Sequence, residues 1–513
     1  MRKCKLLFGL AFTILTLCVL SIGASASTDS PYDVYVSDVP VTPENAADIL
    51  GDGTASYDAE QDLLRLNGYT DRGCSQITTT TSEILYFSIY CNGNTDIEIV
   101  GEGNYFQDAV YTKGGNIMVR NASVTFPGTS FGFLLAEAGD MLLKDSRILV
   151  TSVGNVTNRA FSARNLVLQS TELILETDRP SSYPDSFLYA SREISVTDSK
   201  VRAHMQYPLF LHIFQSAKAT FTNSEVGVSS ANYVFYVPSG ELKLTDCKVE
   251  VTKTRSLSFC ALLTVENTEI DAQLYYSGIR AAYSDDYAKV TLEDSNVRLT
   301  RLPFSDMAAS TLAPIWAAME EEDRQKHGTY ESFLAYFERE IYRTATEIGY
   351  GLAYYSGDLY LSRSTFVSEG FAYGIYGQYG VTFSVDRHCR VDLTAEKGAL
   401  LLFLESPSAV SLTNRNRVSR ATLSHVTASE LLSTSGEYLY GASTGKLSVS
   451  ADGSEGTERE ILDTVQGLST ELVLRTAPYV EGWVVLLIVG GVSVALLSVG
   501  AVLIVRESKR KAR

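Results

Sequence analysis

The chain has 513 residues, of which 45% are hydrophobic, and its formal net charge is −17 at pH 7. This composition allows a large buried core. The negative charge argues against a nucleic-acid-binding protein, because such proteins need clustered lysine and arginine.

Residues 1–26 are expected to form a secretory signal peptide. Three basic residues precede an uncharged apolar run over 6–22, which ends in Ala24, Ser25 and Ala26. A basic start, a short apolar core and an A-x-A exit are typical of a signal that is cleaved during export. A retained N-terminal anchor is the alternative, and the apolar run is short for a membrane span.

A distinctive set of motifs follows the signal. The chain reads Y-D-V-Y-V from Tyr32, N-A-A-D-I-L-G-D-G-T-A-S-Y-D from Asn45 and L-R-L-N from Leu64. This segment resembles the opening module of exported cell-surface β-helix proteins of anaerobic Gram-positive bacteria, some of them described as carbohydrate-binding. The match covers about residues 32–106, and it implies a cell-surface solenoid rather than a particular chemistry. We expect residues 27–96 to form a β module that caps the solenoid.

A short pattern recurs from Ile97 to about Leu393: apolar-x-apolar-x-(Asp/Asn)-(Ser/Thr/Cys)-x-(Val/Ile)-x-apolar. The Asp or Asn (Asx) residues of its six clearest copies are Asn121, Asp145, Asp198, Asn223, Asp246 and Asp294. Looser copies start at Leu166, Leu263, Leu359 and Val381. Successive copies lie 21 to 28 residues apart, which is typical of a solenoid. Alternation on both sides of each Asx-Ser pair predicts two short strands that meet at a bend.

The repeat predicts an all-β fold, a right-handed parallel β-helix over residues 97–300 that continues over 351–440. Stacked coils would align the Asx residues in a column and the inward apolar residues in continuous rows. Asp and Asn alternate at the column position, which favours a structural role, because both tolerate a left-handed backbone and hydrogen-bond to it. A calcium-binding row of carboxylates is the alternative.

The repeat is interrupted at 301–350, where the pattern becomes helical. A helical run begins at Pro314 and stops at Gly328, and Thr329 is placed as the N-cap of a second run that continues to Ile348. We therefore predict a helical insertion that covers apolar surface or strand edges. A partner-docking arm is the alternative.

The C-terminal end predicts a membrane anchor. Residues 441–482 are expected to form a membrane-proximal stalk. Residues 483–505 contain no charge and would form a helix of about 34 Å, enough to cross a bilayer. The tail at 506–513 is basic, and basic flanks collect in the cytoplasm. We expect a single-pass protein of the cell membrane with its N-terminal ectodomain outside and its C-terminus in the cytoplasm.

A cluster of aromatic residues predicts a binding surface. Rings interleave with glycines near the end of the solenoid, and such exposed rings suit stacking on sugars or anchoring of a protein. The candidate ligand-binding residues are Tyr354, Tyr355, Tyr360, Phe371, Tyr373, Tyr376 and Tyr379. The alternative is that half of them alternate into the core.

No specific catalytic signal is present. Asp285-Asp286 is the only Asp-Asp pair, and Asn94-Thr95-Asp96 matches one element of polygalacturonases without the others. Paired carboxylates for a hydrolase would have to meet in space, and these lie about 190 residues apart. We expect no catalytic residue, no metal site and no cofactor, with calcium as the one ion left open.

Five cysteines follow the signal: Cys74, Cys91, Cys247, Cys260 and Cys389. Their spacing does not match a metal site, and an odd number cannot all pair within one chain. Cys74–Cys91 and Cys247–Cys260 are candidate bridges. Cys247 occupies the Ser/Thr/Cys position of the repeat, which favours a buried small side chain.

These features predict a membrane-anchored, cell-surface β-solenoid that displays a non-catalytic binding surface for an extracellular polysaccharide or protein. The alternatives are a calcium-dependent polysaccharide lyase or hydrolase of the pectin-degrading type, and a passive structural spacer. The expected partners are the lipid bilayer, through 483–505, and the extracellular ligand, with no nucleic acid.

Overall fold

The computed structural model describes residues 30–78, 84–127, 132–151, 159–177, 186–205, 212–281, 287–319, 321–339, 349–385 and 388–404, and the short segments 410–411, 413–414, 417–418, 421–424, 438–441 and 471–476. The predicted signal peptide, membrane span and basic tail lie outside these residues, so all three stay predictions. Within the described residues, no helix is long and apolar enough to cross a membrane.

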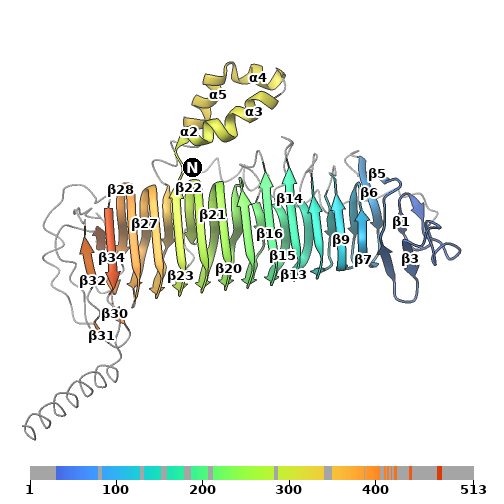
Figure 1. The fold of residues 1–513 in the computed structure, drawn as a ribbon, viewed down its shortest axis with the longest axis horizontal. Coiled ribbons are helices and arrows are strands. Elements are labelled where there is room, and N and C mark those ends of the chain that lie inside the picture. The colour runs from blue at the N-terminus through green and yellow to red at the C-terminus, as the bar shows by residue number, and fades with distance from the viewer. Residues whose placement is uncertain are drawn as a thin grey trace, which may run out of the picture.

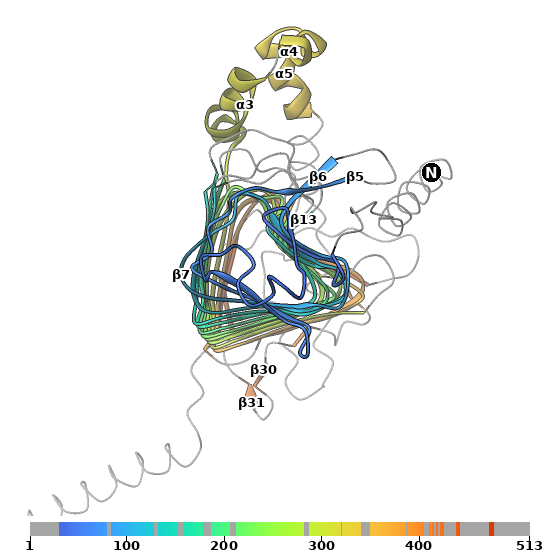
Figure 2. The same ribbon diagram turned by 90° about the vertical axis from the view of Figure 1, so that its right-hand side faces the viewer.

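The described chain is a parallel β-helix (Figures 1 and 2). Its coils wind around a roughly triangular cross-section, and each coil places a strand segment on each of three faces. Parallel pairing joins successive coils, as where β11 (Met141–Lys144) lies between β9 (Ile117–Phe126) and β13 (Arg159–Gln169). The parallel β-helix predicted from the repeat is confirmed on both sides of the helical insertion.

The three faces follow one another in each coil. Face 1 precedes the Asx corner and includes β11, β18 (Lys218–Thr222), β23 (Ala288–Glu293), β26 (Gly357–Ser362) and β29 (Val410–Ser411). Face 2 follows the corner and includes β12 (Arg147–Val150), β14 (Glu172–Thr177), β16 (Lys200–Met205), β19 (Glu225–Ser229) and β24 (Asn296–Arg301). Face 3 closes the coil and includes β6 (Ile84–Cys91), β8 (Ala109–Thr112), β10 (Leu134–Ala136), β17 (His212–Gln215) and β25 (Tyr350–Tyr355). Longer strands turn corners and contribute to more than one face: β7 (Asp96–Tyr105), β9, β13, β15 (Ser186–Thr197), β20 (Tyr233–Thr245), β21 (Lys248–Glu266), β22 (Glu269–Ala281), β27 (Thr365–Val385) and β28 (Arg390–Leu404).

Antiparallel strands close both ends of the β-helix. The N-terminal module contains β1 (Val34–Val36), β2 (Val39–Pro40), β3 (Ala55–Asp58), β4 (Leu63–Asn67) and β5 (Ser75–Thr78). In this module β3 pairs antiparallel with β4, and β4 joins the first coil by parallel pairing with β7. At the other end β33 (Tyr438–Gly441) and β34 (Glu471–Thr476) pair antiparallel with β28, and β32 (Ala421–Ser424) pairs with β34. A small separate hairpin joins β30 (Thr413–Asn414) to β31 (Arg417–Val418). The expected stalk, 441–482, thus contains one strand, and its other residues lie outside the described part apart from Gly441.

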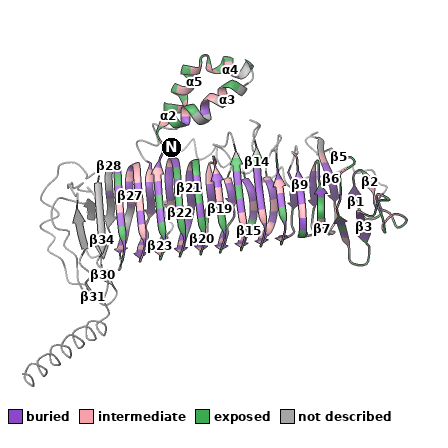
Figure 3. Ribbon diagram, viewed as in Figure 1, coloured by how far each residue is buried: buried purple, intermediate pink, exposed green. Residues whose placement is uncertain are grey.

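Rows of apolar side chains fill the inside of the coils. In one row Ile117, Met141, Leu166 and Ile194 lie in register on face 1, and all four are buried. Figure 3 shows the resulting alternation of buried and more exposed residues along the strands. Each buried side chain of this size stabilises the fold by about 1.5–3 kcal/mol, and only stacking of coils can bury it.

The corner between face 1 and face 2 needs a left-handed backbone. The six Asx residues of the repeat all have positive φ there: Asn121 (48°), Asp145 (49°), Asp198 (51°), Asn223 (47°), Asp246 (55°) and Asp294 (50°). Four further corners have the same geometry with Ser170, Asn267, Arg363 and His388. Asx side chains also bond between coils, as where Asn223 Nδ2 donates to Asp198 Oδ1 at 2.6 Å. The position selects residues that tolerate this φ.

The hydrogen bonds made by the residue after each corner explain why the repeat has Ser, Thr or Cys there. Its hydroxyl accepts a hydrogen bond from the backbone N–H of the equivalent residue one coil earlier, as where Ser199 N donates to Ser224 Oγ at 3.2 Å. The same Oγ donates to the carbonyl of Thr222 at 2.8 Å. Each hydroxyl thereby satisfies a backbone group that the sharp corner would otherwise leave buried without a partner.

Substitutions at Asn223 test the corner geometry. Because Asn223 has a φ of 47°, Asn223→Val should lower the free energy of unfolding by about 1–3 kcal/mol, the cost of a strained backbone. Asn223→Gly should cost less than about 1 kcal/mol, since glycine adopts this φ without strain. Urea unfolding followed by circular dichroism measures both. Equal losses in the two variants would contradict the geometric explanation.

The helical insertion leaves the β-helix after β24 and returns at β25. It contains α2 (Phe304–Met307), the π-helix η1 (Ala308–Leu312), α3 (Ala313–Ala318), α4 (Glu321–His327) and α5 (Tyr330–Phe337). Thr329 caps α5 by accepting a hydrogen bond from Ser332 N at 3.2 Å, and Gly328 has a φ of 79°. The helices project from one corner of the solenoid (Figures 1 and 2). Their small core packs on Tyr275 of β22, so the insertion is anchored beside face 3.

The five cysteines in the described residues are free thiols. The two candidate bridges are therefore not formed. Cys247 occupies the hydroxyl position after the Asp246 corner, and its Sγ lies 3.2 Å from the carbonyl of Thr245. Burial raises the pKa of the Cys260 thiol to about 12, which keeps it protonated and unreactive.

Candidate ligand-binding surface

The predicted aromatic residues do not form one surface. Tyr354 and Phe371 are buried in the solenoid core, and the Tyr354 hydroxyl donates to the carbonyl of Thr382 at 3.0 Å. These two are therefore corrected from ligand-binding to core residues, because their side chains fill the inside of the coils. Tyr360 is half-buried on face 1. The side chain of Tyr379 lies outside the described residues.

Tyr355, Tyr373 and Tyr376 lie together on face 3, next to a ring that the sequence interpretation missed. The rings of Tyr350 and Tyr376 stack with centroids 4.9 Å apart, and Tyr373 lies 5.6 Å from Tyr376. Parallel pairing of β25 with β27 sets Tyr350 opposite Tyr373. Partly exposed rings are thus aligned on adjacent coils, about 4.8 Å apart in the direction of the solenoid axis.

A second group of rings lies on face 3 on the other side of β22. His212 of β17 stacks on Tyr236 at 4.2 Å, with the two planes 3° apart. The ring centres of Tyr233 and Tyr236 of β20 lie 6.3 and 5.7 Å from the ring centre of Phe259 of β21. The two groups lie on the same face because β22 pairs in parallel with β21 on one side and with β25 on the other.

Two arginines connect the groups of rings. The guanidinium of Arg280 lies 5.2 Å from the ring centre of Phe259 and 5.7 Å from that of Tyr355. Arg255 lies 5.2 Å from the ring of Tyr276 and donates to Asn232 Oδ1 at 3.4 Å. We define the aromatic strip as His212, Tyr233, Tyr236, Arg255, Phe259, Tyr276, Arg280, Tyr350, Tyr355, Tyr373 and Tyr376. It is a row of ring faces with two cations held between them.

A pocket of about 90 Å³ opens in the middle of the strip. Its lining is three serines (Ser256, Ser258 and Ser277), Arg280 and four tyrosines (Tyr233, Tyr276, Tyr350 and Tyr355). Ser256 and Ser258 are only 1% and 2% exposed, and neither Oγ has a hydrogen-bond partner among the described residues. Because a buried hydroxyl without a partner costs about 1–3 kcal/mol, this pair is suited to a polar group that enters the pocket.

Burial favours the neutral form of two pocket tyrosines and of the histidine in the strip. Burial is the main cause that raises the pKa of Tyr276 and of Tyr350 above the ordinary value. Burial, helped by the charge of Arg255, lowers the pKa of His212 to about 4. At neutral pH Tyr276, Tyr350 and His212 are therefore hydrogen-bonding groups without charge.

The depressed pKa of His212 predicts a pH-dependent stability. Free histidine titrates near pH 6.5, so on acidification the unfolded chain binds this proton before the folded chain does. The His212 contribution is present above pH 6.5 and is lost as the pH falls towards 4. Between pH 7 and 4.5 the free energy of unfolding should drop by about 2 kcal/mol more in the wild type than in His212→Phe. Equal drops in urea titrations of the two proteins would refute this.

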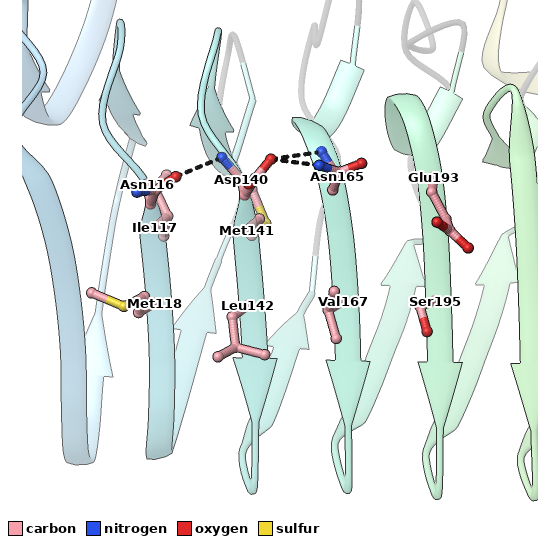
Figure 4. Close-up of a pocket in the computed structure, with 10 residues that line it drawn as sticks. All are labelled: Asn116, Ile117, Met118, Asp140, Met141, Leu142, Asn165, Val167, Glu193 and Ser195. Carbon is pink, nitrogen blue, oxygen red and sulfur yellow. Dashed lines mark hydrogen bonds between the residues drawn. The ribbon is translucent and has the colours of Figure 1, made fainter.

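A larger trough of about 590 Å³ lies on face 1 (Figure 4). Met118, Leu142 and Val167 line its floor, and Asn116, Asp140 and Asn165 form one edge.

The polar groups at this edge already bond to one another between coils. Asn116 Oδ1 accepts from Asp140 N at 2.9 Å, and Asp140 Oδ1 accepts from Asn165 Nδ2 at 2.8 Å. Arg164 bonds both oxygens of Asp140 at 2.9 and 2.8 Å, and this contact is the main cause that lowers the pKa of the carboxyl. The edge is a structural Asx ladder with little capacity left for a ligand.

This ladder includes one of the residues weighed for catalysis. Asp96 Oδ1 accepts from Asn116 N at 2.7 Å and from Asn116 Nδ2 at 2.9 Å, so it holds two coils together. Asp285 and Asp286 lie outside the described residues. In the described part of the chain, no group of three His, Cys, Asp or Glu residues is arranged to hold a metal ion.

The comparisons with known proteins give no relative. The chain matches no protein-family profile, no curated protein and no solved structure.

Proposed function

We propose that the protein is a cell-surface β-solenoid that binds an extracellular polysaccharide, without cleaving it, on the aromatic strip of face 3. The observation that supports this most is the pocket among the rings. It combines ring faces for stacking with two buried serine hydroxyls, Ser256 and Ser258, that lack hydrogen-bond partners among the described residues.

The chemistry of the strip matches a sugar chain. The flat apolar face of a sugar ring stacks on tyrosine, and its hydroxyls take hydrogen bonds from phenols, serines and guanidinium groups. Rings on successive coils repeat every 4.8 Å or so, which lets several sugar units bind side by side. A pocket of about 90 Å³ is smaller than the 300–1,000 Å³ of sites that enclose whole ligands, so it fits one substituent of the chain.

Surface display is supported by the two ends of the sequence. The sequence predicts a signal peptide at residues 1–26 and a membrane-spanning helix at residues 483–505. Strand β34 ends at Thr476, and the few residues before Trp483 reach at most about 25 Å. An anchored solenoid would therefore have its last coil near the membrane. Degradation of the solenoid by protease added to intact cells tests this topology, and protection from the protease would contradict it.

The binding proposal is tested by calorimetry of the full-length chain in mild detergent against soluble polysaccharides, with calcium and then with a chelator. We expect saturable binding to at least one glycan class. Absence of binding to all of them would overturn the proposal and leave a spacer or a receptor for protein. Shortening of a bound polysaccharide that depends on calcium would instead support the lyase or hydrolase alternative.

A further inference from the structure

The charge of the aromatic strip differs from that of the chain as a whole. The protein has a formal net charge of −17. The six strand segments of face 3 that carry the strip contain no Asp or Glu. They are 212–215, 233–237, 255–260, 276–281, 350–355 and 373–377. The face 3 segments of this acidic protein therefore lack carboxylates and carry Arg255 and Arg280.

The arginines are arranged to receive an anion. Arg255 has no ion pair with a carboxylate among the described residues, whereas Arg298 on face 2 pairs with Glu369 at 3.1 Å. Arg280 lines the pocket, and its guanidinium lies between the rings of Phe259 and Tyr355. Contact with ring faces desolvates and orients a guanidinium, which strengthens its hydrogen bonds to an oxyanion.

The electrostatic surroundings are positive. Burial and Arg255 are the two causes that lower the pKa of His212, and no carboxylate opposes them. The Tyr276 hydroxyl is influenced by Arg255 and Arg280, again without a carboxylate. The Ser256 and Ser258 hydroxyls beside Arg280 complete a set of donors of the kind that binds a carboxylate or sulfate.

We infer that the ligand of the strip is an acidic polysaccharide, whose carboxylate or sulfate group enters the pocket between Arg280 and the serines while its rings stack on the tyrosines. This inference rests on the proposed function and narrows it to one class of ligand.

Pairs of acidic and neutral polysaccharides distinguish recognition of the acidic group from recognition of the sugar rings. The full-length protein is titrated with polygalacturonate and with its methyl ester, and with a sulfated galactan and agarose. We expect at least tenfold tighter binding of an anionic form than of its neutral partner, and weaker binding of that form as salt rises. Preference for polygalacturonate alone identifies a uronate ligand, and preference for the sulfated galactan alone identifies a sulfate ester.

Variants locate the effect. Arg255→Gln with Arg280→Gln should remove most of the preference for the anionic form and weaken binding of the neutral form far less than binding of the anionic form. Arg298→Gln, which changes an arginine on face 2, is the matched control and should change neither. Ser256→Val, which fills part of the pocket without changing charge, should also weaken binding of the anionic form and keeps the test valid if the double variant misfolds.

Each result decides between the two proposals. Equal affinity for neutral and anionic forms, or a preference that survives in the arginine and serine variants, would overturn the acidic-ligand inference and leave the polysaccharide proposal intact. Equally strong competition by polyglutamate would overturn it as well, since that polyanion has no sugar rings. Failure of every polysaccharide to bind would overturn both proposals.

Discussion

Replacing Phe221 with alanine should lower the free energy of unfolding by about 3–5 kcal/mol, the range for truncating a buried phenylalanine. Phe221 of β18 has no exposed surface. Its ring centre lies 4.8 Å from that of Phe214 and 5.1 Å from that of Phe235, which come from face 3. The three rings fill the inside of two coils, so truncation leaves a cavity that rigid backbones on both sides cannot close.

Lys218→Ala is the matched control for Phe221→Ala. Lys218 belongs to the same strand, is exposed and pairs with Glu193 at 3.3 Å on the surface. Loss of such a pair should cost less than about 1 kcal/mol. Urea unfolding at a fixed protein concentration measures both variants. A loss below 1 kcal/mol for Phe221→Ala would mean that the inward rows do not determine the stability of the solenoid.

Replacing Tyr350 and Tyr355 together with alanine should weaken polysaccharide binding by about a hundredfold or more. Both rings line the pocket, Tyr350 stacks on Tyr376, and Tyr355 lies against Arg280. Aromatic residues at the centre of an interface contribute about 2 kcal/mol each on truncation, and 1.4 kcal/mol is a factor of ten in affinity. Calorimetry with the tightest-binding polysaccharide gives the ratio.

The control for the tyrosine pair is Tyr360→Ala. Tyr360 is also a half-buried tyrosine close in sequence, but it lies on face 1. Its removal should change the affinity less than threefold, and circular dichroism checks that both proteins fold. Comparable losses in Tyr360→Ala and in the pair would show that ligand binding is not confined to face 3.

The sequence predicted the solenoid because each coil repeats the same local requirement. A left-handed corner followed by a buried hydroxyl needs Asx and then Ser, Thr or Cys, so six corners were visible from residue types alone. Arg363 and His388 adopt the same φ with side chains that signal no turn. There the stacked neighbours impose the geometry, and Arg363 bonds Asp294 of the previous coil.

The binding surface was harder to predict than the fold. Tyr233, Tyr276 and Tyr350 come from different coils, and the helical insertion separates the last two in sequence. Local alternation also fails to separate core from surface residues in β27, where the register shifts between Phe371 and Tyr373. That shift sends Phe371 into the core.

One sequence signal could have revealed more of the strip. Tyr233-x-x-Tyr236 and Tyr373-x-x-Tyr376 place two tyrosines at the same distance on the same face of different coils. Aligning the repeats by their face 3 segments, in addition to their Asx corners, would have grouped these pairs. The pocket itself depends on Ser256 and Ser258 replacing larger residues, which only the packing of neighbouring coils shows.

Hydroxyl-radical footprinting of the full-length protein, with and without a saturating polysaccharide that binds it, tests the central claim most directly. The method reports the solvent accessibility of individual tyrosine side chains. We predict protection of Tyr233, Tyr350, Tyr355 and Tyr373, with Tyr336 of the helical insertion unchanged. Protection confined to Met118 and Leu142 in the face 1 trough, or no protection on face 3, would contradict the assignment of the aromatic strip as the binding surface.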